Sequence, residues 1–209
     1  MEKVDTILFD LDNTLYNEKY CGVLDAIDKK ITQFIIVNLE LSHEQANNMR
    51  YQYWQKHGTT LRGLMLEYDT NPQHYLDFVH DLDFEILIKP DQALHEMLNN
   101  LNHKMIIFTN SSLSHAQRVL KGLEVEHFFD HIYSIESFGF ITKPSPLPYE
   151  HILEEHGGEG DTYLMIDDSL ANLQAAQKFG IRTALIHSEK ESDVDFHLSE
   201  IYELPKLFI

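Results

Sequence analysis

The chain has 209 residues, a formal net charge of −18, a hydrophobic share of 43% and a charged share of 24%. This length suits one sizeable core with room for a smaller lobe, and the composition is that of an ordinary soluble globular protein. The acidic excess argues against a nucleic-acid polymer as partner, because binding to a phosphate backbone needs a basic surface and the sequence holds no Lys/Arg cluster.

No apolar run is long enough to cross a bilayer, and residues 1–5 lack the basic start and apolar core of a signal peptide. The single cysteine, Cys21, excludes an intrachain disulfide. We therefore expect a cytoplasmic protein, monomeric or homodimeric, that acts on a small molecule. If that molecule is anionic, a bound divalent cation with a lysine nearby would have to oppose the overall negative field.

In chain order, short apolar segments alternate with amphipathic helical patterns, which is typical of an α/β domain with a parallel sheet. Strands with the continuous apolar character of strands covered on both faces are expected at 6–9, 105–108, 163–166 and 183–186, with a weaker candidate at 132–135. Helices are expected at 94–101 after a cap at Asp91, at 116–123, from about Pro146, and from Ser169 to a stop at Gly180.

The segment from residue 17 to residue 89 interrupts this alternation. It holds no convincing strand, and its apolar residues repeat at helical spacing, first in the stripe Leu24, Ile27, Ile31, Phe34 and Ile35. We expect residues 17–89 to form a helical lobe inserted after the first strand, and residues 1–16 and 90–209 to form the α/β core.

The first chemical motif, Asp10-Leu11-Asp12-Asn13-Thr14, directly follows the expected strand 6–9. Side chains at the carboxyl end of a parallel strand face the crevice in which open α/β sheets bind ligands. One of the two carboxylates can ligate a hard cation and attack phosphorus, while the other transfers a proton. The alternative is a polar loop that only caps the strand.

Two further motifs carry groups that suit an anion. Thr109-Asn110-Ser111 follows the expected strand 105–108, where a hydroxyl and backbone N–H groups can cradle a phosphate, although these residues are also common in turns. Lys143 stands in Thr142-Lys143-Pro144 before the expected helix. A lone lysine is usually a solvated surface residue, so this one gains interest only from its place in the series.

The fourth motif, Asp167-Asp168-Ser169 with Asn172, follows the expected strand 163–166. Adjacent carboxylates at the end of an apolar strand repel each other and are costly to desolvate, and a bound cation relieves both problems. We therefore interpret the pair as metal ligands. The alternative is a helix N-cap with acidic residues near the positive end of the helix dipole.

Taken in this order, the four motifs resemble the haloacid dehalogenase (HAD) superfamily, and the resemblance spans essentially the whole chain. It implies a Rossmann-like α/β core with a parallel sheet and an all-helical cap domain inserted just after the first motif. It also implies a phosphatase that depends on Mg²⁺ and forms an aspartyl-phosphate.

The resemblance implies a role for each site residue. Asp10 would attack the phosphoryl group, and Asp12 would protonate the leaving alkoxide and then activate the water that hydrolyses the intermediate. Asp10 and the backbone carbonyl of Asp12 would also ligate the metal.

The remaining motifs would hold the substrate and the metal. Thr109 and the N–H of Asn110 would bind phosphate oxygens, and Lys143 would neutralise charge and orient the nucleophile. Asp168 would be a direct magnesium ligand, with Asp167 a ligand either directly or through water.

A closer resemblance, to the pyrimidine 5′-nucleotidase-like branch, lies in the segments 12–16, 58–64 and 79–90, and in Phe108-Thr109-Asn110 followed by His115-Ala116. It implies 5′-nucleoside monophosphates as substrates. Arg62 could meet the substrate or form a surface salt bridge. The aromatic side chains of Tyr51, Tyr53 and Trp54 could stack on a base, but we expect them in the core of the helical lobe.

Other functions fit parts of the pattern. A sugar-phosphate phosphatase or a phosphomutase of the same superfamily would keep the same residues. A dehalogenase would also use Asp10 but needs neither magnesium nor an acid at Asp12. A non-catalytic phospho-receiver or binding module clusters similar residues, but it lacks a large helical insertion after the first strand.

Overall fold

The computed structural model describes residues 3–187 and 192–208. The chain divides into two compact units, one formed by Met1–Asn17 with Ile88–Ile209 and the other by Glu18–Leu87. The first unit is discontinuous in the sequence, because the second is inserted between its first strand and the rest of its sheet.

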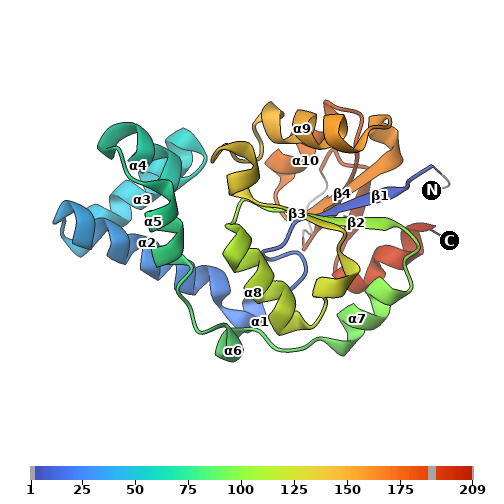
Figure 1. Ribbon diagram of the computed structural model, residues 1–209, viewed down its shortest axis with the longest axis horizontal. Coiled ribbons are helices and arrows are strands. Elements are labelled where there is room, and N and C mark those ends of the chain that lie inside the picture. The colour runs from blue at the N-terminus through green and yellow to red at the C-terminus, as the bar shows by residue number, and fades with distance from the viewer. Residues whose placement is uncertain (1–2, 188–191, 209) are drawn as a thin grey trace. The chain divides into compact units, whose positions relative to one another are not determined.

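The first unit is built on a six-stranded sheet of described residues in the order β3-β2-β1-β4-β5-β6 (Figure 1). Every pairing is parallel. The strands are β1 Thr6–Phe9, β2 Lys104–Phe108, β3 His131–Tyr133, β4 Tyr163–Asp167, β5 Arg182–Ile186 and β6 Phe196–Leu198. Central strand β1 pairs with β2 and β4, so Phe9 lies opposite both Ile107 and Ile166.

The strands predicted at 6–9, 105–108, 163–166 and 183–186 are confirmed to within one residue. The weaker prediction at 132–135 is wrong at its end, because Ile135 begins a 3₁₀ helix, η2 Ile135–Phe138. Strand β6 was not predicted. It has only three residues, of which Leu198 alone is buried, so it presents no apolar run.

Helices cover both faces of the sheet, with α9 and α10 on one face and α7 and α8 on the other (Figure 1). The side chains of Leu8, Ile106 and Met165 are fully buried, as expected for strands that are covered on both faces of the sheet. The helices are α7 Gln92–Asn99, α8 Leu113–Leu123, α9 Pro146–His156 and α10 Leu170–Gln177, with short 3₁₀ helices η1 Glu126–Phe128, η3 Gly160–Thr162 and η4 Ile201–Phe208.

Two predicted helix ends are confirmed by their cap geometry. The side chain of Asp91 accepts a 2.9 Å hydrogen bond from the backbone N–H of Leu94 at the start of α7. After α10 the chain turns at Gly180, whose φ of 75° lies in the left-handed region that glycine adopts without strain.

The second unit, all of whose residues the structure describes, contains helices and no strand. Its helices are α1 Glu18–Cys21, α2 Val23–Leu39, α3 His43–His57, α4 Thr60–Tyr68, α5 Pro72–Val79 and α6 Phe84–Leu87. The ring of Phe34 packs edge-on against Tyr75 at a centroid distance of 5.1 Å, which ties α2 to α5. The predicted fold class, a parallel α/β core with an inserted all-helical region, is confirmed.

The prediction that three aromatic side chains of this lobe lie in its core is wrong for two of them. Tyr53 is 6% exposed, whereas Tyr51 is 54% and Trp54 is 58% exposed. The buried face of α3 carries Ala46 and Tyr53, which are two helical turns apart. Tyr51 and Trp54 stand two positions before and one position after Tyr53, so their side chains leave the helix on other faces. No helix in the described part of the chain combines the length and apolarity needed to cross a membrane.

Candidate active site

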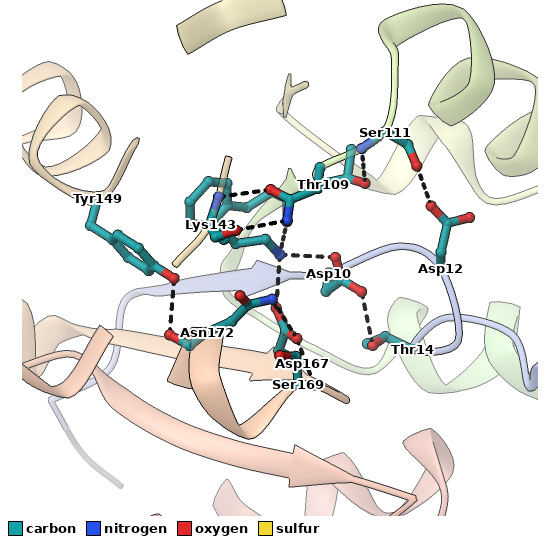
Figure 2. Close-up of polar contacts among 12 residues, drawn as sticks. Asp10, Asp12, Thr14, Thr109, Ser111, Lys143, Tyr149, Asp167, Ser169 and Asn172 are labelled. Carbon is teal, nitrogen blue, oxygen red and sulfur yellow. Dashed lines mark hydrogen bonds and ion pairs between the residues drawn. The ribbon is translucent and has the colours of Figure 1, made fainter. Parts of the chain in front are cut away.

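The predicted motif residues meet at the carboxyl edge of the sheet because of the strand order. Asp10 follows β1, Thr109 follows β2, and Asp167 is the last residue of β4. Since β1 lies between β2 and β4, these three strand ends are neighbours in space. The loop before α9 adds Lys143 to the same place (Figure 2).

Lys143 is the centre of the polar network. Its side chain is fully buried, and its Nζ donates to Asp10 Oδ1 at 2.9 Å, to Asp167 Oδ2 at 2.7 Å and to the carbonyl oxygen of Phe108 at 2.6 Å (Figure 2). All three ammonium hydrogens therefore have acceptors. Although burial alone lowers a lysine pKa, the charges of Asp10 and Asp167 raise the pKa of Lys143 above its ordinary value.

Asn110 fixes the backbone of this lysine from the neighbouring loop. Its Nδ2 donates to the carbonyl oxygen of Lys143 at 3.0 Å, and its Oδ1 accepts from the backbone N–H of Lys143 at 2.8 Å. The side chain thus pairs with the lysine main chain in both directions. Thr109 is 2% exposed, and its Oγ1 accepts from the N–H of Ser111 at 3.0 Å.

Asp167 is held from three directions. Besides Lys143, its carboxylate accepts from Nδ2 of Asn172 at 3.1 Å and from the backbone N–H of Ser169 at 2.8 Å. The hydroxyl of the buried Tyr149 donates to the carbonyl oxygen of Asn172 at 2.9 Å, which links α9 to the start of α10. The alternative interpretation is confirmed in part, because Ser169 is the N-cap residue of α10 and follows the two acidic residues directly, but its side chain makes no cap hydrogen bond.

Three carboxylates form an acidic cluster whose possible ligand oxygens all lie within 4.8 Å of one another: Asp10, Asp167 and Asp168. Burial, together with the charges of its acidic neighbours, raises the pKa of Asp10 even though Lys143 opposes the shift. Burial also raises the pKa of Asp168, whose Oδ2 accepts from Nδ2 of Asn13 at 2.7 Å. One lysine therefore does not balance the negative charge of this cluster.

These residues fit a hard divalent cation. Carboxylate oxygens are the ligands that Mg²⁺ prefers. The repulsion between the carboxylates contributes to the raised pKa values of Asp10 and Asp168, and a cation bound among them would remove this repulsion. The chemistry of the donor set and the unbalanced buried charge point to the same kind of ion.

Asp12 lies beside this cluster in a different environment. Its Oδ1 accepts from the hydroxyl of Tyr16 and from Nε2 of His115, both at 2.6 Å, and its Oδ2 accepts from the hydroxyl of Ser111 at 2.6 Å. Burial alone would raise its pKa, but the charge of His115 and these hydrogen bonds bring the pKa of Asp12 well below its ordinary range. In the free protein Asp12 is therefore a carboxylate.

The contacts of Asp12 include two residues to which the sequence assigned no function, Tyr16 and His115. Tyr16 stands four positions after Asp12 and could have been suspected from local spacing. His115 is separated from Asp12 by 103 positions and lies on the buried face of α8, where its spacing matches that of the apolar residues. Arg62 lies exposed on α4 in the second unit, within the predicted helical lobe, and its predicted contact with the substrate stays a prediction.

Fold and site together define a Rossmann-like α/β protein with an acidic site at the carboxyl edge of its sheet. A family model for haloacid dehalogenase-like hydrolases matches residues 4–180. The chain belongs to this family, as its motifs predicted.

Individual relatives match most of the chain. Phosphate metabolism protein 8 of Saccharomyces cerevisiae is 30% identical over 189 residues, which cover 83% of this chain and 58% of that protein's length. A phosphoglycolate phosphatase of Aquifex aeolicus is 25% identical over 96% of this chain and 95% of its own. The fold matches that of a HAD hydrolase from Bacillus subtilis bound to magnesium, with a TM-score of 0.65, 19% identity and 98% of each chain covered.

Proposed function

We propose that this protein is a magnesium-dependent phosphomonoester hydrolase that forms an aspartyl-phosphate on Asp10. The observation that carries the proposal is the pairing of two chemically distinct carboxylates at one sheet edge. Asp10 belongs to a buried cluster with Lys143, whereas Asp12 is surrounded by hydrogen-bond donors. Two carboxyl groups in different environments can take different roles in one reaction.

In the first step, an oxygen of Asp10 attacks phosphorus and the bond from phosphorus to the ester oxygen breaks. Oδ1 is engaged by Lys143, whereas among the described residues Oδ2 has only a 3.3 Å contact from the Thr14 hydroxyl, so Oδ2 is the nucleophile that we assign. Lys143 stabilises the negative charge that builds up on the transferring group.

Asp12 supplies the proton to the leaving oxygen in this step and removes one from water in the next. The carboxylate form found in the free protein suits the second role directly. For the first role, Asp12 takes up a proton from solvent when the substrate binds, because the negative charge of the bound phosphate dianion raises the pKa of its carboxyl group. In the second step the activated water attacks phosphorus and the bond from phosphorus to Oδ2 of Asp10 breaks. When phosphate leaves, the pKa of Asp12 falls again and its proton passes to solvent, which restores the starting state.

The metal-binding residues in this proposal are Asp10, Asp167 and Asp168, together with the backbone carbonyl of Asp12. Bound Mg²⁺ supplies charge neutralisation at the phosphoryl oxygens. Since Lys143 and Asn172 occupy both oxygens of Asp167, that residue is the member of the set best suited to act through water. The magnesium bound to the B. subtilis hydrolase of the same fold supports the choice of ion.

For the substrate, we propose small phosphorylated metabolites, with 5′-nucleoside monophosphates, pyrimidines first, as the leading candidates. Support for nucleotides comes from the resemblance of the segments 12–16, 58–64 and 79–90 to the pyrimidine 5′-nucleotidase-like branch. Thr109, Asn110 and Arg62 are the proposed phosphate or substrate contacts. A phospho-acid, as the name of the A. aeolicus relative suggests, and a sugar phosphate are the competing substrate classes.

The test is release of phosphate from a panel of nucleoside monophosphates, sugar phosphates and phospho-acids, with Mg²⁺ and with a chelator. We expect turnover only with the metal, nucleotides near the top, and loss of turnover in Asp10→Asn. A profile led by sugar phosphates or phospho-acids would overturn the nucleotide proposal alone. Transfer of the phosphoryl group within a sugar phosphate would identify a phosphomutase, and a single uptake of phosphate without turnover would identify a receiver.

A further inference from the structure

The histidine beside Asp12 is held in place before any substrate arrives. His115 is 0% exposed and lies in the first turn of α8, where its backbone N–H donates to the capping hydroxyl of Ser112 at 3.2 Å. The buried face of α8 is otherwise apolar, with Ala116, Val119, Leu120 and Leu123. A buried histidine among apolar neighbours is costly unless its ring nitrogens meet partners, and here Nε2 meets Oδ1 of Asp12 at 2.6 Å.

The donors around Asp12 are divided unevenly between its two oxygens. A carboxylate offers about four lone-pair positions, two on each oxygen. Tyr16 and His115 occupy both positions on Oδ1, whereas Ser111 is the one donor to Oδ2 among the residues that the structure describes. One position on Oδ2 is left for a proton in transit.

We propose that His115 is a positioning residue for the acid/base group: together with Tyr16 it saturates Oδ1 of Asp12, so that Oδ2 is the atom that gives and takes the proton. This inference rests on the proposed phosphatase activity and deepens it. His115 touches neither substrate nor the transferring group in this assignment. It acts only by fixing the rotation of the Asp12 carboxylate.

A positioning role makes a specific prediction about leaving groups. A nitrophenolate leaves without much help, whereas an alkoxide must be protonated as the bond to phosphorus breaks. Misplacing the Asp12 carboxylate therefore slows attack on an alkyl phosphate more than on an activated aryl phosphate. A loss of general packing or of metal binding would slow both reactions by the same factor.

The experiment compares kcat/KM for benzyl phosphate and 4-nitrophenyl phosphate, two substrates of similar size, in the full chain with saturating Mg²⁺. Positioned acid catalysis contributes roughly 10²–10⁴-fold, so we expect His115→Ala to lose about 100-fold or more with benzyl phosphate and less than about 10-fold with 4-nitrophenyl phosphate. His115→Gln, which returns an N–H donor at a similar reach, should recover most of the benzyl phosphate activity.

Two further variants keep the test decisive. Tyr16→Phe removes the other donor to the same oxygen with little change in shape, so it should show the same selective loss even if His115→Ala fails to fold. His156→Gln is the packing control, since His156 is a partly buried histidine that bonds to the Tyr133 hydroxyl at 2.8 Å and to Lys104 at the opposite end of β2. We expect wild-type rates with both substrates.

Equal losses with both substrates in His115→Ala and Tyr16→Phe, or no loss in either, would overturn the positioning role and leave the phosphatase proposal intact. If the wild-type protein hydrolyses neither ester, the proposed function itself fails.

Discussion

The ammonium nitrogen of Lys143 lies 2.9 Å from Oδ1 of Asp10, although the two residues are 133 positions apart in the chain. The same nitrogen lies 2.7 Å from Asp167, so one buried cation separates two buried carboxylates. Because these charges are desolvated, the lysine serves both the stability of the core and the proposed chemistry.

Replacing Lys143 with methionine should destabilise the metal-free protein by about 3–5 kcal/mol, since it leaves buried carboxylates without their partner. Urea unfolding measures this free energy. Lys104→Met is the control, because Lys104 is exposed and should shift the free energy of unfolding by less than about 1 kcal/mol. Equal stability of Lys143→Met and wild type would show that the network carries no net stabilisation.

Replacing Asp168 with asparagine should weaken magnesium binding, because it removes a charged oxygen ligand from the acidic cluster. We expect the dissociation constant for Mg²⁺, measured by isothermal titration calorimetry, to rise by roughly 10–100-fold, the range typical for disturbed metal sites. Asp161→Asn, which removes a partly exposed carboxylate that pairs with Lys3, should bind the metal as wild type does. The assignment of Asp168 fails if both variants behave alike.

As the pH is lowered, the affinity of this site for Mg²⁺ should begin to fall at a higher pH than the affinity of a site whose carboxylates have ordinary pKa values. Burial raises the pKa values of Asp10 and Asp168, and the metal binds only their deprotonated forms. Protons should therefore compete with Mg²⁺ at pH values well above about 4, where exposed carboxyl groups titrate. The measurement is the apparent dissociation constant for Mg²⁺ between pH 5 and 8, and a flat profile would contradict the raised pKa values.

The same raised pKa values set the sign of a stability effect. The native metal-free protein binds these protons more tightly than the unfolded chain does, so its free energy of unfolding falls as the pH rises through the native pKa values. Added Mg²⁺ should then raise the thermal midpoint more at pH 7 than at pH 5. The reverse order in a thermal-shift titration would be inconsistent with the cluster as the binding site.

Gly160→Ala should destabilise the core unit, because a Cβ at this position would stand 1.9 Å from the carbonyl oxygen of Phe179. The Cβ is fixed to its own backbone and the carbonyl oxygen belongs to the backbone of Phe179, so neither can move aside, and we expect a loss of about 2–4 kcal/mol in urea unfolding. Gly122→Ala is the comparison, since its Cβ would meet a side-chain atom of Ile88 at 2.8 Å, which can shift. A larger loss at Gly122 would contradict this explanation.

Local sequence predicted most of the core unit. Strand β1 was placed correctly because its four residues are all apolar or β-branched and buried on both faces. The same logic could not find β6, a three-residue strand whose sequence has no continuous apolar character. For the exposed Tyr51 and Trp54, composition indicated burial, but only the packing of α3 determines which face of that helix is covered.

The sequence predicted those residues of the site that directly follow a strand. Asp10, Thr109 and Asp167 all stand at strand ends, and the parallel order brings these ends together. His115 was not predicted, because its spacing on α8 matches that of the apolar residues and only the three-dimensional structure shows its contact with Asp12. A contact between residues so far apart in the chain produces no local pattern in the sequence.

The most direct measurement is chemical trapping of the intermediate on Asp10. The protein is mixed with excess substrate and Mg²⁺, quenched with acid during turnover and treated with borohydride, which converts an aspartyl-phosphate to homoserine, and the peptides are then sequenced by mass spectrometry. The account predicts homoserine at position 10, with none in a sample that lacked substrate. Rapid turnover with Asp10 unmodified, or homoserine at another aspartate, would contradict it.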